Sequence, residues 1–228
     1  MRTIYIKGDT LANVWERSIK AILEKGTLKD TEYGMPAKTI KLLARVEDAL
    51  KEPRISTVSP FKEKLVKKYV DEMLVVKEHD FDYMYSERLM AYPKIKDKFN
   101  QIKWTIETLN KSPITRRVAL ITRTVPDDCL TEKSTPCLTM LHFGIVIDIE
   151  GEEEERNLYM DVIFRSHDAW GAANANWYAL GELAKKVVEG LDFDIHRVIL
   201  DNYSCDYHIY EHDLEEAEET LLGKFNNP

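Results

Sequence analysis

Several features that define familiar protein classes are absent from this sequence of 228 residues. No apolar run approaches the ~20 residues that a membrane-spanning helix needs, so no transmembrane helix is predicted. The three cysteines form no CxxC pair, and their odd number argues against a disulfide scaffold and for a reducing compartment. The sequence also has no Walker loop, no GxGxxG and no GxSxG. A P-loop, a glycine-fingerprint dinucleotide site and a serine-hydrolase elbow are therefore not indicated.

The chain also has fewer basic side chains than acidic ones. The chain has 40 acidic side chains against 32 basic ones, which gives a net charge of −8. Contacts along a nucleic acid need a basic surface, so this composition argues against nucleic-acid binding but leaves room for a small anion held by local arginines. The first nine residues alternate apolar and polar side chains, which is typical of a short edge strand rather than a secretion signal. We therefore expect a cytoplasmic protein.

Length and composition suit one globular domain over residues 1–228, with 44% hydrophobic residues available for a core. Apolar spacings predict helices mainly in the first half, and alternation predicts strands mainly in the second half. The predicted helices span residues 10–25, 61–73, 96–111, 173–189 and 214–222. The predicted strands span residues 1–9, 40–46, 118–122, 138–149, 158–164 and 195–200. The order of elements predicts an α+β protein whose mixed β-sheet has helices packed on one face.

Two segments carry side chains suited to an anion or to a nucleophile. Arg116 and Arg117 begin a strand, where neighbouring side chains point to opposite faces and most arginines are surface residues. Their functional use would be bidentate binding of a phosphate or carboxylate. Cys137 follows Pro136 at the entry to a long apolar strand, where a cysteine is more often a small buried residue. The proline marks an exposed entry, and a nucleophilic thiol there would need nearby cationic charge.

Two later segments combine strand ends with polar groups. Residues 165–168 (Arg-Ser-His-Asp) end an apolar strand, and a helix start of small residues follows with Asn174 and Asn176. Strand ends and helix starts commonly carry ligand groups, although an ordinary capped junction is the alternative. Residues Cys205 to His212 contain a Cys-x2-His-x3-His pattern. This segment has no second cysteine pair and reads as extended, so we predict no metal site.

Taken in order, these segments resemble the nucleotide site of the thymidylate synthases. That family combines an Arg-Arg pair, a later Pro-Cys nucleophile, an Arg-Ser-x-Asp strand end leading to an Asn and Tyr-Ala-Leu, and an Asp-x-His-Ile-Tyr segment. Here the set appears as Arg116-Arg117, Pro136-Cys137, residues 165–168 with residues 174–180, and residues 206–210. The resemblance covers residues 82–216 and includes Tyr85-Ser-Glu-Arg-Leu89, which looks like the family's Tyr-Gly-x-x-Leu.

The resemblance implies a site for dUMP and a covalent mechanism. Cys137 would add to C6 of the pyrimidine, because C5 is a poor nucleophile until a thiolate saturates C6. Arg165 and Ser166 would hold the 5′-phosphate together with Arg116 and Arg117 of a second subunit. The resemblance therefore implies an obligate homodimer that associates through its sheets.

The same resemblance assigns the groups that bind the rest of the nucleotide and the carrier. His208 and Tyr210 would bind the deoxyribose hydroxyl. Asn174 or Asn176 would read the base, since counting from either end of the motif selects a different asparagine. Asp168 would contact the one-carbon carrier.

Proton transfer and the carrier complete the implied reaction. Glu72 lies where the family keeps its catalytic glutamate on a helix, and Tyr85 would help to remove the C5 proton through water. The compact length looks like the archaeal, methanogen-type branch, so the carrier would be 5,10-methylenetetrahydrofolate or a methanopterin analogue. Hydride from the carrier would give the methyl group of dTMP, and water would give hydroxymethyl.

The sequence departs from the family at several positions. The early phosphate-binding arginine is not identifiable, with Arg54 as a candidate substitute, and Leu138 and His142 replace the usual histidine and glutamine. The tail, residues 224–228, lacks the usual small hydrophobic ending. Two alternatives stay open, a hydroxymethylase acting on dCMP or dUMP and a catalytically retired nucleotide-binding homologue. An asparagine at the base favours uracil, whereas aspartate would suit the amino group of cytosine.

Overall fold

The computed structural model describes residues 1–92, 98–130, 134–150 and 153–223. Their strands form one sheet in the order β1-β3-β8-β6-β5-β4, with β2 paired to β3 and β7 paired to β8. The strands are β1 (Thr3–Gly8), β2 (Thr27–Lys29), β3 (Ala37–Val46), β4 (Ala119–Ile121), β5 (Leu138–Glu150), β6 (Glu153–Phe164), β7 (His167–Asp168) and β8 (Arg197–Tyr210). Strand β8 runs parallel to β6 and antiparallel to β3, so the sheet is mixed, as the sequence predicts.

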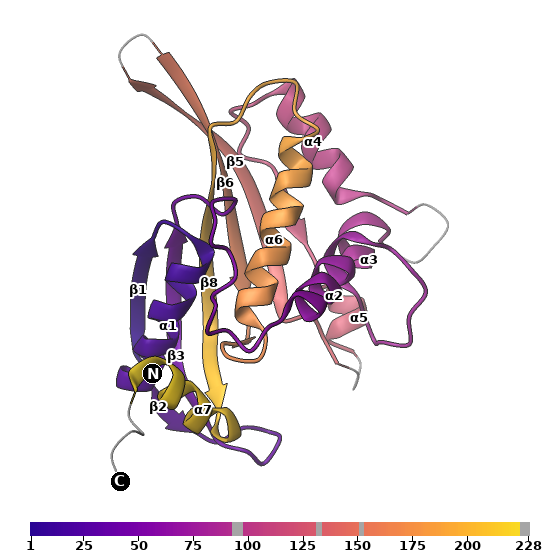
Figure 1. The fold of residues 1–228 in the computed structure, drawn as a ribbon. Coiled ribbons are helices and arrows are strands. Elements are labelled where there is room, and N and C mark those ends of the chain that lie inside the picture. The colour runs from indigo at the N-terminus through magenta and orange to yellow at the C-terminus, as the bar shows by residue number, and fades with distance from the viewer. Residues whose placement is uncertain (93–97, 131–133, 151–152, 224–228) are drawn as a thin grey trace.

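Seven helices accompany this sheet within the described residues. They are α1 (Leu11–Lys25), α2 (Glu63–Leu74), α3 (Tyr85–Met90), α4 (Gln101–Lys111), α5 (Val125–Asp128), α6 (Ala173–Val188) and α7 (Glu211–Leu222). Helices α1, α4 and α6 lie on the same side of the sheet (Figure 1). Thr10 caps α1, because its hydroxyl accepts a hydrogen bond from the backbone N–H of Asn13 (3.3 Å). The predicted α+β class is confirmed.

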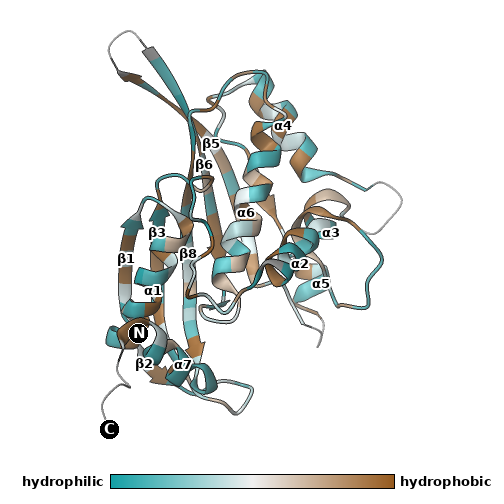
Figure 2. Ribbon diagram, in the orientation of Figure 1, coloured by the Kyte–Doolittle hydropathy of each residue, from teal (hydrophilic) through white to brown (hydrophobic). Residues whose placement is uncertain are grey.

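Burial alternates along the central strands, as expected where successive side chains point to opposite faces. On β6, Met160 and Val162 are buried in the main core together with Trp177 of α6. Asp161 and Ile163, which lie between and beyond them, are half-buried on the other face. Figure 2 shows the corresponding mixture of apolar and polar residues along the strands and helices. The helices therefore cover one face of the sheet, and the second face is more open.

The boundaries of two elements differ from the prediction in a way that matters for the site. Strand β8 extends to Tyr210, whereas the apolar run predicted a strand only to residue 200. Its polar second half continues along β3 and β7, which hold it in the sheet despite its composition. Helix α4 begins at Gln101 and is capped by Asn100, whereas the predicted start at residue 96 lies outside the described residues. None of the described helices combines the length and apolarity needed to cross a bilayer.

Candidate functional site

Cys137 lies directly before β5, in a segment that several hydrogen bonds hold in place. The backbone N–H of Leu138 donates to the Tyr85 hydroxyl (3.1 Å). The guanidinium of Arg165 donates to the two carbonyl oxygens that precede the cysteine, at 3.0 and 2.9 Å. The backbone N–H of Arg165 also donates to the carbonyl oxygen of Cys137 (2.9 Å). The cysteine is therefore fixed between the end of β6 and the start of β5.

The groups around the Cys137 thiol shift its pKa in opposite directions. Burial raises the pKa of Cys137, the positive charge of Arg165 lowers it, and the nearby carboxylate of Asp168 raises it again. The net result is a pKa above the ordinary thiol value. In this chain alone the thiol is therefore mainly protonated at neutral pH, and a base or added positive charge would have to generate the nucleophilic thiolate.

A cavity of about 350 Å³ opens beside the thiol, and we call it the cysteine cavity. Six residues that the sequence predicts for the site line it together: Cys137, Arg165, Ser166, Asp168, His208 and Tyr210. They come from the start of β5, the turn from β6 to β7, and the polar end of β8. Parallel pairing of β7 with β8 sets Asp168 opposite His208, which explains why segments far apart in sequence meet here. The structure thus brings four of the eight predicted nucleotide-binding residues into one place, together with Cys137 and Asp168.

A hydrogen-bonded cluster around Asp206 forms the floor of this cavity. Lys29 and Thr39 both donate to its carboxylate, and His208 Nδ1 lies 3.5 Å from Oδ1. Burial alone would raise the pKa of Asp206, but the hydrogen bonds from His208, Lys29 and Thr39 hold it well below its ordinary value. The ring of Tyr210 packs edge-on against His208 with centroids 4.8 Å apart. The cluster therefore orients the two side chains predicted to bind the sugar.

A second carboxylate of the cysteine cavity, that of Asp168, is hydrogen-bonded to the segment that leads into α6. Gly171 N–H donates to Asp168 Oδ1 (2.8 Å), yet burial raises the pKa of this carboxyl above its usual range. Burial and the carboxylates of Asp168 and Glu72 together raise the pKa of Tyr69 to about 12. The Tyr69 hydroxyl thus lies within electrostatic range of both carboxylates and connects the cysteine cavity to helix α2.

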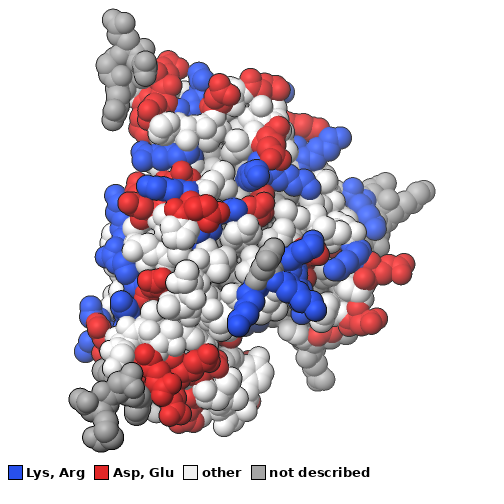
Figure 3. Space-filling model, in the orientation of Figure 1, with Lys and Arg blue, Asp and Glu red and all other residues white. Residues whose placement is uncertain are grey.

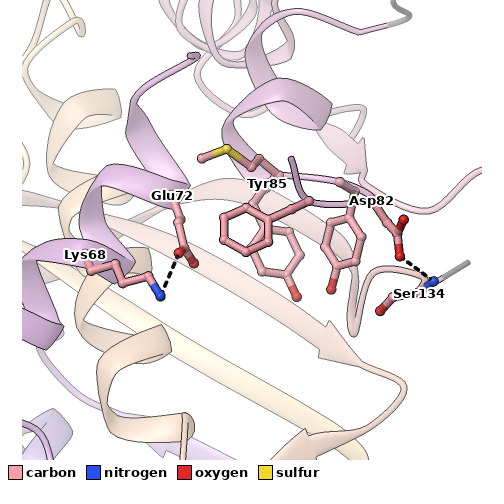
Figure 4. A pocket seen from close by; sticks show the side chains of 8 residues that line it. Lys68, Glu72, Asp82, Tyr85 and Ser134 are labelled. Carbon is pink, nitrogen blue, oxygen red and sulfur yellow. Dashed lines mark hydrogen bonds and ion pairs between the residues drawn. The ribbon is translucent and has the colours of Figure 1, made fainter. Parts of the chain in front are cut away.

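A second cavity of about 350 Å³, which we call the tyrosine cavity, lies on the α2 side of Cys137. Figure 4 shows Glu72 and Tyr85 facing this space from α2 and α3, with Lys68 3.7 Å from the Glu72 carboxylate. Its remaining lining includes the aromatic rings of Phe81 and Tyr83. Both residues that the sequence predicts for proton transfer, Glu72 and Tyr85, therefore share one cavity.

The phenols of Tyr83 and Tyr85 lie between the tyrosine cavity and Cys137. Their rings meet edge-on with centroids 5.5 Å apart. Tyr83 forms hydrogen bonds with the backbone of Cys137 and with the Tyr85 hydroxyl, and burial raises the pKa of both phenols. Cys137 therefore stands between two cavities, one polar and one aromatic.

Arg116 and Arg117 do not line either cavity of their own chain. Both are exposed in the segment that leads into β4. Within the described part of the chain, neither guanidinium forms an ion pair with a carboxylate. Their position is compatible with a role outside their own subunit, which is what the family resemblance implies for them.

Neither predicted base-reading asparagine lies on the lining of the cysteine cavity. The amide of Asn174 is buried and hydrogen-bonded at both ends, because it accepts from Ser56 N–H (3.0 Å) and donates to the Arg54 carbonyl (3.0 Å). Asn176 is 9% exposed and its amide nitrogen lies 3.3 Å from His167 Nε2. Of the two, Asn176 keeps its amide oxygen uncommitted among the described residues, so it is the better candidate.

Arg54, the candidate substitute for the missing phosphate-binding arginine, does not line either cavity. Its guanidinium pairs with Glu52 and Glu182 and lies over the ring of Tyr178. These contacts hold Arg54 against α6, away from the lining of both cavities. The role suggested for Arg54 from the sequence stays a prediction, and in this structure its guanidinium already has two acidic partners.

Sequence reasoning missed several residues that the structure places at the site. The segment from Lys29 to Tyr33 and the side chain of Thr39 line the cysteine cavity, and Tyr83 lines the tyrosine cavity. The available signal was a polar run between a helix and a strand, which looks like an ordinary loop. Within the described residues, no group of three or more His, Cys, Asp or Glu side chains is arranged to hold a metal ion.

Comparison with known proteins gives a consistent picture. The family model described as thymidylate synthase matches residues 54–227. A protein of Methanocaldococcus jannaschii is 32% identical over 202 residues, which cover 85% of this chain and 87% of the relative. A protein of Methanopyrus kandleri is 30% identical over 93% of this chain and 96% of its own length. A protein of Methanosarcina mazei is 26% identical over 96% and 94%. All three carry the provisional name thymidylate synthase.

Proposed function

This chain belongs to the thymidylate synthase family, and on that premise we propose that it methylates C5 of dUMP to form dTMP. The carrier would be 5,10-methylenetetrahydrofolate or a methanopterin analogue, which supplies the methylene carbon and the hydride. One observation carries the proposal. A single cysteine, Cys137, stands between a polar cavity suited to a nucleotide and an aromatic cavity suited to a flat pterin ring.

In the proposed reaction, the Cys137 sulfur forms a bond to C6 of the base, and the electron pair of the C5–C6 double bond moves to make C5 nucleophilic. Arg165 would favour the thiolate by its charge and contact the 5′-phosphate with Ser166. His208 and Tyr210 would bind the sugar hydroxyl. Asn176, with its uncommitted amide oxygen, would read uracil in preference to Asn174.

The tyrosine cavity would hold the carrier and manage the C5 proton. Its aromatic side chains fit the face of a pterin, and its carboxylates can accept hydrogen bonds from ring nitrogens. After C5 attacks the carrier methylene, the C5 proton would leave through water held near Tyr85, with Glu72 positioning that water. Asp168, whose pKa is raised by burial, would hydrogen-bond the carrier from the other side.

We further propose that the active form is a homodimer. The face of the sheet away from the main helices carries half-exposed or exposed apolar side chains, among them Tyr5 (63% exposed), Leu43 (38%) and Val146 (43%). A depression of about 510 Å³ lined by Tyr5, Leu43 and other residues lies on this face. A partner sheet would bury this surface and could bring the exposed Arg116 and Arg117 to the opposite cysteine cavity. The three cysteines are free thiols, which suits a cytoplasmic enzyme.

Release of tritium from dUMP labelled at C5 tests the proposed function. We expect release to water that requires a reduced folate or methanopterin carrier and is lost in Cys137→Ala. Cys129→Ala is the matched control, because Cys129 is an exposed cysteine away from both cavities. Chromatography of the product separates a methyl from a hydroxymethyl group, with dCMP tested in parallel.

The negative outcomes are separable. Nucleotide binding without tritium release, with either carrier, would indicate a homologue that has lost catalysis. Absence of binding to both dUMP and dCMP would contradict the assignment of the cysteine cavity to a nucleotide.

A further inference from the structure

Trp15 of α1 lies against the turn that carries Asp168, and no role proposed above uses it. The indole is fully buried, and its Nε1–H donates a hydrogen bond to the carbonyl oxygen of Ala169 (2.8 Å). The ring also stacks on that of Trp170, with centroids 5.5 Å apart and planes inclined by 28°. Trp15 therefore contacts the two residues that directly follow Asp168, although it stands 154 positions before Ala169 in the sequence.

Three elements hold this turn in place. From β8, the carbonyl oxygen of His208 accepts a hydrogen bond from the backbone N–H of Ala169 (2.7 Å). From α7, Glu216 accepts one from the indole N–H of Trp170 (3.3 Å). With the bond from Trp15 of α1, both backbone groups of Ala169 are used. Ala169 is fully buried, so loss of the Trp15 donor would leave its carbonyl oxygen without a partner.

The orientation of the Asp168 carboxylate depends on the same turn. The backbone N–H of Gly171 donates to Asp168 Oδ1 (2.8 Å), so the far end of the turn holds one carboxylate oxygen. A Cβ atom on residue 171 would lie 2.4 Å from Asp168 Oδ2, so the other oxygen occupies space that a side chain would need. Asp168 lines the cysteine cavity. A shift of Ala169 or Gly171 would therefore move this carboxylate relative to the cavity.

We propose that Trp15 is a positioning residue for Asp168, and that its hydrogen bond to the turn fixes where the carboxylate meets the one-carbon carrier. This inference rests on the proposed function, which assigns Asp168 to the carrier. It goes beyond the family assignment, because the family model matches residues 54–227 and α1 lies outside that range. A tryptophan that only filled the core would affect dUMP and carrier binding alike, whereas a positioning role predicts an effect on the carrier.

Calorimetric titration of the full-length protein, saturated with dUMP, tests the proposal with tetrahydrofolate and with tetrahydromethanopterin as probes. Neither probe carries a methylene group, so binding is measured without group transfer. Trp15→Phe keeps an aromatic ring but loses the donor. It should weaken binding of the pterin that the wild type binds by about fivefold or more. The dissociation constant of dUMP, titrated separately, should stay within about twofold.

A variant of the same helix controls for lost packing. Ile22→Val removes one methyl group from a fully buried side chain of α1 that makes no hydrogen bond to the turn. It should change neither the dUMP nor the pterin dissociation constant by more than about twofold.

The effect of Trp15→Phe should also depend on the carboxylate. In an Asp168→Asn background, which removes the charge that the carrier would meet, adding Trp15→Phe should weaken pterin binding by less than about twofold. Gly171→Ala is an independent second variant, because its Cβ atom would displace the carboxylate while Trp15 stays unchanged. It should weaken pterin binding and leave dUMP binding within about twofold of the wild type.

The contrary outcomes are distinguishable. Trp15→Phe with unchanged pterin binding, or with equal losses for dUMP and the pterin, would overturn the positioning role and leave the proposed function standing. The same conclusion would follow from an equal loss with and without the Asp168 carboxylate, or from normal pterin binding in Gly171→Ala. A wild-type protein that binds dUMP but neither pterin would overturn both the inference and the proposed methyl transfer.

Discussion

The two cavities on either side of Cys137 differ in what builds them. The cysteine cavity is made from strand ends and from a network of carboxylates, His208 and Arg165, so that the sheet fixes its geometry. The tyrosine cavity is made from α2, residues 81–85 and Ser134, and three of its eight lining residues are aromatic. Figure 3 shows that basic side chains gather over α2 and acidic ones over α7. Under the proposed function, nucleotide binding and proton transfer would therefore occupy separate parts of the fold, which meet at one thiol.

Removal of the shared nucleophile should have the largest effect. Cys137→Ala should lower tritium release by about 10³-fold or more, because no other group can saturate C6 of the base. Binding of dUMP, measured by calorimetry, should change by less than about threefold, since the other cavity groups remain. A variant that keeps substantial release would show that the two cavities do not meet at this residue.

Neutralising the Glu72 carboxylate in the tyrosine cavity should have the next largest effect. Glu72→Gln should reduce kcat by about 10²-fold, the range expected for a group that handles a proton in the transition state. The dUMP dissociation constant should stay close to the wild-type value, because Glu72 does not line the cysteine cavity. A large loss of dUMP binding in this variant would contradict the division of labour between the cavities.

A substitution of Arg165 should change both dUMP binding in the cysteine cavity and the pKa of the Cys137 thiol. Arg165→Gln should weaken dUMP binding by about tenfold, because a charged hydrogen bond to phosphate is lost. The same change removes the cation that lowers the pKa of Cys137, so that pKa should rise further. Rates of alkylation by iodoacetamide, measured against pH, should therefore shift toward higher pH. An alkylation profile identical to that of the wild type would contradict the electrostatic role of Arg165.

The smallest expected effect concerns His167, which lies under the cysteine cavity. Burial lowers its pKa to about 3, and its ring contacts Ser204 and Asn176. The unfolded chain therefore binds a proton at a higher pH than the folded chain does, so this residue costs stability as pH falls below the ordinary histidine value near 6.5. At pH 5.5 the loss relative to pH 7 should be about 1 kcal/mol.

Chemical denaturation of the wild type and of His167→Gln at the two pH values measures this contribution. The variant should lose less stability on acidification than the wild type. Equal losses in both proteins would show that His167 is not buried as a neutral ring.

The sequence predicted the site residues best where reactive or polar side chains stand in short segments at the ends of strands. Cys137, Arg165, Asp168 and His208 belong to short polar segments at strand ends, and strand pairing then brings them together. The same regularity made most helices and strands recognisable, because burial on one face imposes a period on the side chains. The second half of β8 was not predicted as a strand, because polar side chains that line the cysteine cavity alternate there with the buried Tyr207 and Ile209.

Other parts of the site could not be read from the sequence. The choice between Asn174 and Asn176 depends on how α6 is rotated against residues 54–56, which is a matter of tertiary packing. The acidic loop with Glu32 resembles a solvated turn in sequence, and only the fold of β2 against β3 turns it toward the thiol. Nothing in the sequence indicates that the guanidinium of Arg54 forms ion pairs with two glutamates.

The most direct test of the central claim is intact-mass and peptide mass spectrometry after incubation with 5-fluoro-dUMP and each reduced carrier. Fluorine at C5 cannot leave as a proton, so a covalent adduct at C6 should accumulate. We predict a mass increase on the peptide that contains Cys137, and no increase in Cys137→Ala. Protein that binds the nucleotide but stays unmodified, or that is modified at Cys129 or Cys205 instead, would contradict the account.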